Sequence, residues 1–242
     1  MSNKMISIVT INYNNSLGLK KTIESINAQT CDDFEYIIID GNSTDDSVAI
    51  GNGCPKCDIF VTEKDDGIYD AMNKGAELAS GEYILFLNSG DTLRDNSVKV
   101  FIDVLLATHC SYDIYHGILA FEKEGVILNY RGRTEHLLRS GMIEHPTVLM
   151  RKKKFDSLYG FDLKWKYVAD YDLIIRAKRE ESTFYFIETV LSNFDVSGVS
   201  STSIKAPIES LKLQKHHKLI SNLEYLARLY FMKLKGLLLW LK

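Results

Sequence analysis

Two apolar, β-branched runs near the start of the chain decide the fold: ISIVTI over Ile6–Ile11 and FEYIII over Phe34–Ile39. Two further runs of this kind follow at residues 59–62 and 83–87. Strands that are apolar along their whole length are typical of a parallel sheet that is covered on both faces. We therefore predict four neighbouring strands, most of them parallel, in the first hundred residues.

Helical patterns separate these strands. Leu19, Ile23 and Ile26 recur at the spacing of one helix face. Further helices are expected after the acidic pair at 45–46, over residues 71–79 and over residues 97–106. This alternation predicts an α/β protein with an open, doubly wound, mostly parallel sheet. In such a sheet, ligands bind beyond the carboxyl ends of the strands.

The second half of the chain is less regular. One clear helix is expected over residues 169–179, and a helical pattern returns from about residue 208 to the end. Four strand-like pieces are expected, at residues 112–120, 126–130, 147–150 and 183–187.

Composition limits the class of protein. The chain has 242 residues, of which 45% are hydrophobic and 25% charged, enough for a packed core and too apolar for a disordered chain. The net charge of −3 argues against a partner such as nucleic acid. No apolar stretch reaches the roughly 18 residues of a transmembrane helix, and the first residues lack a secretory h-region. We expect a cytoplasmic protein.

Acidic and amide side chains follow three of the predicted strands. They occur in the segments Asp40–Asp46, Asp65–Gly75 and Asn88–Asp91. Any one of these carboxylates could instead cap a helix or form a turn. Three such clusters at one edge of one sheet suit a divalent cation together with the sugar hydroxyls and base of a nucleotide.

The sequence excludes two common kinds of nucleotide-binding site. The turn after the first strand carries only Gly18, where a dinucleotide fingerprint needs three glycines, and the chain has no GxxxxGK[ST] loop. A phosphatase with paired aspartates is also disfavoured, because Asn42 stands where the second aspartate would be.

Four segments in the same order resemble family 2 glycosyltransferases of the GT-A fold. They are IVTINYN (Ile8–Asn14), IIIDGNSTDDS (Ile37–Ser47), DGIYDAMNKG (Asp66–Gly75) and FLNSGD (Phe86–Asp91). The similarity covers roughly residues 5–200 and is closest to bacterial members that build capsule, exopolysaccharide and lipid-linked glycans. The resemblance implies a GT-A domain over residues 1–205. Its nucleotide-binding half would cover about 1–108, its acceptor half about 109–205, and a tail would follow at 206–242.

The resemblance also implies roles for individual residues on the donor side. Asn12 and Tyr13 would line the nucleotide base, and Asp40 would hydrogen-bond the uracil or ribose. Asp66 and Lys74 would complete the nucleotide pocket, with Lys74 contacting the diphosphate or the base. The donor is expected to be a UDP-sugar.

One residue of the family's metal motif is present. Asp91 matches the last carboxylate of the DxD element and would hold Mg²⁺ or Mn²⁺ against the donor diphosphate, which gains negative charge as it leaves. Asn88 and Gly90 stand where the common motif has carboxylates. Metal affinity in the absence of donor should therefore be low.

The family's general base lies at the start of a later helix. Ala169-Asp170-Tyr171-Asp172-Leu173 matches that place, so Asp170 is the expected base, with Asp172 as the alternative on the acceptor side. An inverting transferase needs such a carboxylate to take the proton of the acceptor hydroxyl. His145 sits where relatives carry a histidine and would contact the acceptor or a phosphate, although a lone histidine can equally be structural.

The end of the chain differs from the rest in charge. From residue 205 onward there are eight basic and two acidic residues, a net charge of +6, whereas the preceding residues carry a net −9. An apolar stripe from Leu219 to Leu241 recurs every three or four residues. Such a helix suits the surface of an anionic bilayer, which would bring the enzyme to a polyprenyl-linked acceptor. The stripe could equally pack on the domain or on a second subunit, so a homodimer stays open.

These observations predict an inverting hexosyltransferase of surface polysaccharide synthesis. It would use a nucleotide diphosphate sugar as donor and a glycan or lipid-linked hydroxyl as acceptor. The depleted metal motif leaves one alternative, a catalytically inactive subunit that binds nucleotide sugar and serves in assembly. A nucleotidyltransferase would carry a glycine-rich loop with a basic residue after the first strand, which the sequence lacks.

Overall fold

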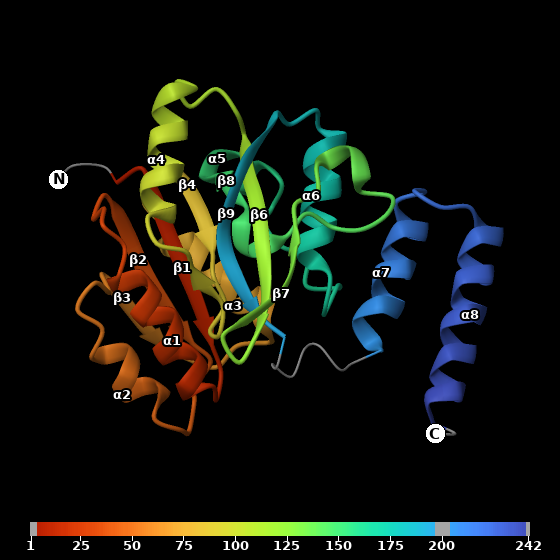
Figure 1. Cartoon of the computed structure of the whole chain (residues 1–242), viewed down its shortest axis with the longest axis horizontal. Coiled ribbons are helices and arrows are strands. Elements are labelled where there is room, and N and C mark those ends of the chain that lie inside the picture. The colour runs from red at the N-terminus through yellow and green to blue at the C-terminus, as the bar shows by residue number, and fades with distance from the viewer. Residues whose placement is uncertain (1–3, 197–203, 241–242) are drawn as a thin grey trace.

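The computed structural model describes residues 4–196 and 204–240, with side chains up to residue 232 in the last helix. The described chain forms a nine-stranded sheet with helices on both faces, and two further helices extend from one side (Figure 1). The predicted α/β class is confirmed, and the sheet runs through both predicted halves. The division near residues 108 and 205 stays a prediction.

The first half of the sheet is parallel, as the apolar runs predict. Its strands are β1 (Ile6–Asn12), β2 (Phe34–Asp40), β3 (Ile59–Thr62) and β4 (Tyr83–Phe86), in the spatial order β3-β2-β1-β4. All seven residues of β1 are buried, because it is a central strand that is covered on both faces. The carboxyl ends of β1 and β2 meet at one edge, where Asn12 is paired with Asp40.

Helices on opposite faces of this sheet enclose two separate cores. On one face, α1 (Ser16–Asn27) and α4 (Ser97–Ala107) cover side chains such as Ile8 and Tyr36. On the other, α3 (Ile68–Leu78), α5 (Lys152–Ser157) and α6 (Ala169–Arg179) cover side chains such as Val9 and Ile37. Successive strand residues point to opposite faces, so each strand contributes to both cores. A short helix α2 (Ser47–Asn52) joins β2 to β3.

The second half of the sheet is mixed in direction. After β4 the order continues as β8 (Leu149–Arg151), β6 (Ile114–Lys123), β9 (Phe184–Asp195) and β5 (Thr92–Leu93), and β7 (Val126–Arg131) pairs with β6. The strand predicted at 147–150 begins only at Leu149, because residues 145–147 form a 3₁₀ turn. The strand predicted at 183–187 is much longer, because β9 stays paired with β6 through bulges as far as Asp195.

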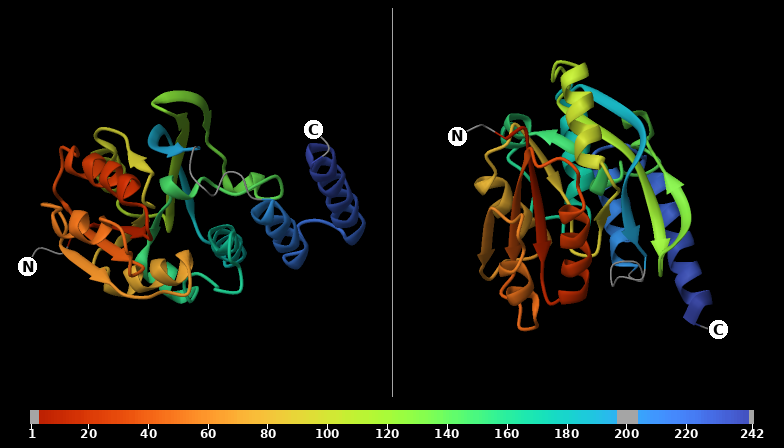
Figure 2. Two further views of the ribbon diagram at one scale, coloured as in Figure 1. Left: turned by 90° about the horizontal axis from the view of Figure 1, so that it is seen from below. Right: turned by 60° about the vertical axis from the view of Figure 1, so that its left-hand side comes forward.

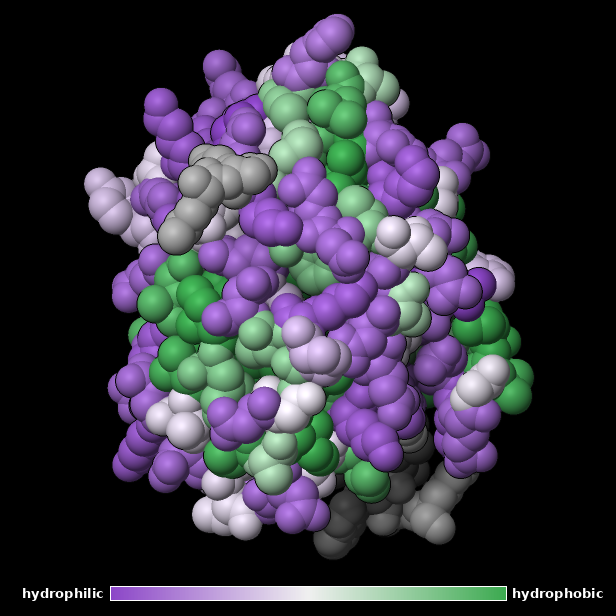
Figure 3. Space-filling model, turned by 90° about the vertical axis from the view of Figure 1, so that its left-hand side faces the viewer, coloured by the Kyte–Doolittle hydropathy of each residue, from purple (hydrophilic) through white to green (hydrophobic). Residues whose placement is uncertain are grey.

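The helical pattern at the end of the chain forms two helices rather than one. They are α7 (Lys205–His216) and α8 (Asn222–Trp240), separated by a turn in which Lys218 has a positive φ of 51°. Side views show α7 nearer the domain and α8 outside it (Figure 2). The opposite side of the molecule, formed by the first half of the chain, interleaves hydrophilic side chains with smaller hydrophobic groups (Figure 3).

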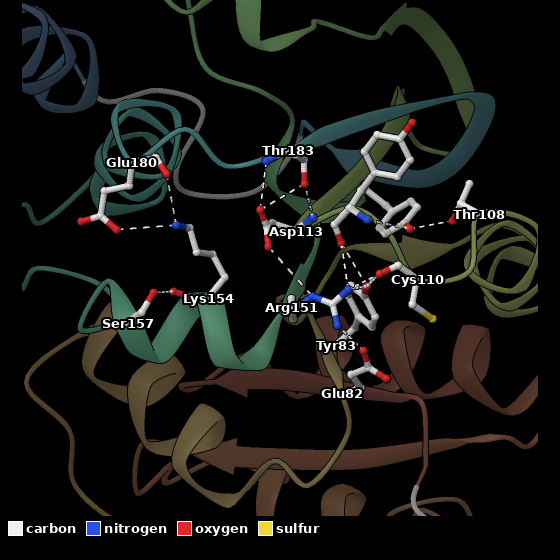
Figure 4. A network of polar contacts seen from close by, with 12 residues as sticks. Glu82, Tyr83, Thr108, Cys110, Asp113, Arg151, Lys154, Ser157, Glu180 and Thr183 are labelled. Atoms are coloured by element: carbon white, nitrogen blue, oxygen red, sulfur yellow. Dashed lines mark hydrogen bonds and ion pairs between the residues drawn. The ribbon is translucent and has the colours of Figure 1, made fainter.

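A polar network stabilises the edge of the sheet where β4 begins (Figure 4). Arg151, at the end of β8, donates hydrogen bonds to the side chain of Glu82 and the carbonyl of Cys110. Its guanidinium also lies over the Tyr83 ring, 4.7 Å from the centroid. Nearby, Asp113 accepts a hydrogen bond of 2.9 Å from the backbone N–H of Thr183. This network joins the starts of β4, β6 and β9, at the edge opposite the acidic segments.

Candidate active site

A cavity of about 770 Å³ opens at the carboxyl edge of the sheet. Its walls come from the end of β1, the start of α1, the loop before α3, the turn after β4 and the end of β9. Of the residues predicted for the donor site, this cavity brings together Asn12, Tyr13 and Asp91. It is the expected place for a ligand in an open α/β sheet.

Asn12 and Asp40 form the floor of this edge. Asn12 Nδ2 donates a hydrogen bond of 2.9 Å to Asp40 Oδ1, and the Asp40 carboxylate also accepts hydrogen bonds from Ser43 and Thr62. Asp40 is fully buried and does not line the cavity, so in this structure it holds Asn12 and the turn after β2. A direct contact between Asp40 and the nucleotide stays a prediction.

Asn12 and Tyr13 are neighbours in the wall of the cavity. Asn12 Oδ1 is buried and has no hydrogen-bond partner within residues 4–196 and 204–240. Tyr13 follows β1 and is 64% exposed, so the face of its ring is available for stacking. An aromatic ring beside an unpaired amide oxygen fits a nucleobase, which stacks and donates hydrogen bonds.

The loop before α3 contributes a different aspartate from the one predicted. Asp65 lines the cavity, whereas Asp66 is exposed and its N–H bonds to Asp70. Lys74 also lies outside the cavity wall, with its Nζ 2.9 Å from Glu63 and 3.3 Å from Asp70. Its hydrogen bond with Glu63 is the main cause of a raised Lys74 pKa. Nucleotide contacts of Asp66 and Lys74 therefore stay predictions that would require these groups to move.

Two acidic residues, Asp91 and Asp195, line the other end of the cavity. Asp91 lies in the turn after β4 and is 5% exposed, and Asp195 is the last residue of β9. Antiparallel pairing of β5 with β9 brings these two regions together. Burial, and secondly the charge of Asp195, raise the pKa of Asp91 well above its usual value. Lys21 of α1 lies 3.0 Å from Asp195 Oδ2, so the cluster already contains one positive charge.

The turn that carries Asp91 depends on Gly90. Gly90 has a φ of 106°, a conformation that residues with a Cβ rarely adopt. Its N–H donates to Thr22 Oγ1 at 2.9 Å, and Thr22 Oγ1 donates to the carbonyl of Asp91 at 2.7 Å. The backbone here therefore favours glycine at the position where the common family motif has a carboxylate.

The carboxylate pair fits a divalent cation that the donor would complete. In the described ranges no group of three or more His, Cys, Asp or Glu side chains is arranged to hold a metal ion. Asp91 and Asp195 could nevertheless supply two hard oxygen ligands, and a cation would offset both the burial and the repulsion from Asp195 that raise the Asp91 pKa. Mg²⁺ commonly binds through one or two carboxylates together with substrate phosphates.

Asp170 lies in the first turn of α6, beside the predicted donor cavity. Tyr69 donates a hydrogen bond of 2.9 Å from its hydroxyl to Asp170 Oδ1. Burial, followed by the charge of Asp170, raises the pKa of the Tyr69 phenol well above its usual value, so the hydroxyl remains a donor. Tyr69 is adjacent in sequence to Ile68, which lines the cavity. Asp170 thus lies behind the wall that α3 contributes.

A small apolar hollow joins Asp170 to His145. Both residues line it, together with Phe86 and Phe161. The His145 ring stacks on Phe86 with centroids 5.8 Å apart, and burial lowers the pKa of His145. His145 Nε2 is buried and without a hydrogen-bond partner in the part of the chain that is described. The predicted base and the predicted acceptor-side histidine therefore share one surface.

Asp172 does not join this surface, and its expected place on the acceptor side is wrong. Its carboxylate is 1% exposed and lies 2.6 Å from Arg176 Nε and 2.6 Å from His217 Nε2. Trp165 Nε1 also donates to it, at 3.1 Å. Burial acts to raise the Asp172 pKa, but the hydrogen bonds from His217 and Arg176 outweigh burial and lower it. Asp172 points into the packing between α6 and α7.

Sequence reasoning missed three residues of the site. Asp65 adjoins the predicted Asp66, and only the exact shape of the loop separates their roles. Lys21 lies one helical turn after Leu17, which lines the cavity too. Asp195 ends a strand whose length is hidden because it continues through the polar residues Glu188 and Thr189. The strand β5, which pairs with β9 near Asp195, lies about a hundred residues earlier.

Comparisons with known proteins agree with this geometry. The family model described as glycosyl transferase family 2 matches residues 7–158, more than half of the chain. A PGL/p-HBAD biosynthesis glycosyltransferase of Mycobacterium bovis is 29% identical over 210 residues, which cover 84% of this chain and 82% of that protein. The chondroitin synthase of Escherichia coli is 30% identical over 96% of this chain, which spans only 34% of that enzyme.

Solved structures show the same fold at low sequence identity. Staphylococcus aureus TarS 1–349 in complex with UDP-GlcNAc has a TM-score of 0.71 at 16% identity, over 88% of this chain and 65% of that one. The mannosyltransferase PcManGT of Pyrobaculum calidifontis, in complex with GDP-Man and Mn²⁺, has a TM-score of 0.61 at 14% identity, over 93% of this chain and 64% of that one. With the GT-A sheet and the family model in agreement, the chain belongs to glycosyltransferase family 2.

Proposed function

We propose that this family 2 glycosyltransferase is an inverting enzyme of surface polysaccharide synthesis. It would move a sugar from a nucleotide diphosphate sugar, with UDP as the nucleotide, to a hydroxyl of a glycan or lipid-linked acceptor. The observation that carries the proposal is a single cavity that both parts of a nucleotide diphosphate could occupy. Asn12 and Tyr13 fit a nucleobase, and Asp91 and Asp195 fit the divalent cation of a diphosphate. The UDP-GlcNAc complex of TarS, which shares this fold, supports a nucleotide-sugar donor.

The donor would lie along the cavity with its base at Tyr13 and its diphosphate at Asp91. Two carboxylates alone would repel a diphosphate, so this orientation requires positive charge. Lys21 supplies one cation at that end. Asp91 and Asp195 would hold Mg²⁺ or Mn²⁺, whose charge stabilises the leaving diphosphate.

Asp170 would act as the general base of the transfer. The acceptor oxygen attacks C1 of the donor sugar from the face opposite the diphosphate, while the Asp170 carboxylate takes the hydroxyl proton. The new C1–O bond forms as the bond from C1 to the phosphate oxygen breaks, and the electron pair leaves with the diphosphate. Attack from the opposite face inverts C1. Tyr69 orients the carboxylate through its 2.9 Å hydrogen bond.

His145 would serve on the acceptor side of the same reaction. It is close to Asp170 and offers an unpaired ring nitrogen at the hollow that the two residues share. Because burial lowers its pKa, the imidazole is neutral at neutral pH and can exchange a hydrogen bond with a sugar hydroxyl.

A thermal-shift screen tests the donor. We expect UDP and UDP-sugars with Mn²⁺ to raise the melting temperature more than GDP, CDP or TDP counterparts, with a smaller shift when Mn²⁺ is omitted. Asp91→Ala should remove the Mn²⁺-dependent part of the shift. Equal shifts with every nucleotide, or none that depends on Asp91, would contradict the proposed donor site.

An assay of UDP release separates the enzyme from the alternative of an inactive assembly subunit. That alternative followed from a single carboxylate in the metal motif, and Asp195 now supplies a second one. We expect the wild type to release UDP from a UDP-sugar in the presence of Mn²⁺. Tight UDP binding without any release or transfer would favour the inactive subunit.

The last helix suggests where the enzyme works. On α8, the side chains of Leu223, Leu226, Tyr230 and Phe231 are 59–78% exposed and recur on one face of the helix. The segment from residue 205 carries a net charge of +6. Within residues 4–196 and 204–240, no helix has both the length and the hydropathy to cross a bilayer. The proposed occupant of this face is the anionic inner surface of the cytoplasmic membrane, where a polyprenyl-linked acceptor would lie.

Vesicle flotation tests this surface with a matched control. Leu226 and Leu128 are the same residue type and are 59% and 58% exposed, but Leu128 lies on β7. Leu226→Glu should reduce binding to phosphatidylglycerol vesicles by at least tenfold, and Leu128→Glu should leave it unchanged. Unchanged binding of Leu226→Glu would overturn the proposal, as would a dimer that the variant dissociates without any effect on vesicle binding.

A further inference from the structure

We propose that α7 is a positioning element for the catalytic base, and that Glu209 and His217 are the residues through which it acts. The inference rests on the proposed role of Asp170. Outside the cavity, α7 contacts the chain immediately before and immediately after Asp170, although it lies some forty residues later in sequence. In Figure 1, α7 stands between α6 and α8.

The contact after Asp170 is buried and charged. His217, the residue that follows α7, places its Nε2 2.6 Å from Asp172 Oδ1, and both side chains are almost fully buried. Asp172 also bonds to Arg176 one turn later, at 2.6 Å. Arg176 in turn donates 2.7 Å to the carbonyl of Gly160. The side chain of Asp172 is thus fixed from two directions, one of which is α7.

The contact before Asp170 is made to the backbone. Glu209, in the second turn of α7, accepts hydrogen bonds from the N–H groups of Lys166 and Tyr167, at 3.2 and 2.6 Å. These two residues form the last stretch of loop before α6 begins at Ala169. Val168, the N-cap of α6, makes no side-chain capping hydrogen bond. A carboxylate of α7 therefore fixes the entry of a helix that lacks a side-chain cap of its own.

A third contact lies beside the base and reaches α8. Gln214 of α7 donates 3.3 Å to the hydroxyl of Tyr171, the residue next to Asp170, and Tyr171 donates to the carbonyl of Leu138. Arg228 of α8 donates 3.3 Å to Gln214 Oε1. Leu213 packs into the same core as α6 and is fully buried. α7 therefore contacts the chain on both sides of Asp170.

The reaction rate should depend more strongly on the exact position of the Asp170 carboxylate than on the exact positions of the residues that bind the donor. A base must meet the acceptor hydroxyl within hydrogen-bond distance, and a displacement of about 1 Å can cost about a hundredfold in rate. The Asp170 carboxylate accepts hydrogen bonds from the hydroxyl of Tyr69 and from the N–H of Tyr171. None of the α7 contacts described above involves the walls of the nucleotide cavity. Loosening α7 should therefore change turnover and leave nucleotide binding intact.

Hydrogen exchange and calorimetry test this inference on the full chain. We expect Glu209→Ala and His217→Ala to raise amide exchange at residues 166–173 and not at residues 12–18 or 88–92. The Kd for UDP with Mn²⁺ should stay within about twofold of wild type. Lys212→Ala, on the exposed face of the same helix, is the control and should change neither quantity. Wild-type exchange at 166–173 in both variants would overturn the inference, as would an equal rise throughout the chain.

Kinetics separate positioning from simple loss of structure. For UDP-glucose and UDP-N-acetylglucosamine, whichever the enzyme turns over, both alanine variants should lower kcat about tenfold to a hundredfold with donor KM unchanged. His217→Gln and Glu209→Gln keep a hydrogen-bonding group and should recover most of the rate. If either alanine variant does not fold, its glutamine counterpart supplies the exchange and kcat measurements, and a wild-type value of both would overturn the inference.

A double variant distinguishes this inference from the proposed function. If Asp170 is the base and α7 acts through it, adding His217→Ala to Asp170→Asn should lower the residual rate by less than about twofold. A full additive loss would show that α7 does not act through Asp170. Full turnover in Asp170→Asn alone would instead refute the proposed base, whatever the exchange experiment shows about α7.

Discussion

The two edges of the sheet use polar residues in opposite ways. Where β4 begins, the Arg151 guanidinium donates to acceptors on two segments, at Glu82 and at Cys110, and Asp113 accepts a hydrogen bond from Thr183. At the carboxyl edge, buried polar atoms are left without partners among the described residues, including Asn12 Oδ1 and Asn88 Oδ1. Two acidic residues, Asp91 and Asp195, also line the cavity there. The first edge contributes stability, whereas the second retains unsatisfied groups for a ligand.

The largest effect on turnover should come from replacing Asp170, the proposed base, which lies near the carboxyl edge of the sheet. Asp170→Asn keeps the shape of the side chain and removes its ability to take a proton, so turnover should fall about 10²- to 10⁴-fold. UDP affinity should stay within about threefold, because Asp170 lies outside the nucleotide cavity. Steady-state kinetics and calorimetry on the same preparation check both values. A large loss of UDP affinity would show that Asp170 lies on the donor side.

The edge around Arg151, where β4 begins, should respond in the opposite way, with a loss of stability and no change in ligand binding. Arg151→Ala removes the group that joins Glu82, Cys110 and Tyr83, so the free energy of unfolding should fall by about 2–3 kcal/mol. UDP binding with Mn²⁺ should be unchanged in the folded fraction. Urea unfolding followed by circular dichroism measures the change. A stability equal to that of wild type would mean that this network is as dispensable as an exposed ion pair.

His116 tests whether every unpaired buried group belongs to the ligand site. It is the third residue of β6, fully buried, and neither ring nitrogen has a partner in the described chain. Burial lowers its pKa from 6.5 to about 4. Below pH 6.5 the unfolded chain therefore takes up a proton that the folded chain refuses, and stability falls as the pH falls.

That difference amounts to about 2 kcal/mol between pH 7.5 and pH 5. His116→Phe should remove this part of the pH dependence, which urea unfolding at a series of pH values would reveal. An identical slope in wild type and variant would show that His116 is protonated equally in both states.

The smallest effect should be a gain in the stability of the protein when Asp91, at the carboxyl edge of the sheet, is replaced. Asp91→Asn removes a carboxylate that is buried and also feels the charge of Asp195, so without ligand the free energy of unfolding should rise by about 1 kcal/mol. The same variant should lose the extra stabilisation that Mn²⁺ and UDP give the wild type. Thermal unfolding with and without both ligands measures the two effects. A destabilised unliganded variant would mean that Asp91 serves the fold more than the ligand.

The fold was more predictable than the site because its signals are local. The apolar runs at Ile6–Ile11 and Phe34–Ile39 identify β1 and β2 almost to the residue, since a strand buried on both faces admits little else. The helix at 169–179 was also predicted with its observed bounds. By contrast, β5 has two residues, too few for any periodic signal. β9 continues through polar residues that only its pairing with β6 explains.

The site depended on contacts that no local pattern encodes. Asn12, Tyr13 and Asp91 were predicted because they follow strands; they line the cavity, and their roles there stay predictions. Asp172 was misplaced because its position one turn from Arg176 and beside His217 is a product of tertiary packing. Asp195 was missed for the same reason, since its neighbour Asp91 comes from a different part of the chain.

The pairing of β5 with β9 also determines when the end of the cavity that Asp91 and Asp195 line can exist. Asn193 Nδ2 reaches Thr92 Oγ1 across a separation of 101 residues. Contacts between such distant segments form late in folding, after the entropy of closing a long loop has been overcome. During synthesis, the first hundred residues could fold around β1 and still be unable to retain the donor. Binding of a nucleotide sugar would thus show that β9 has been synthesised and has paired with β5.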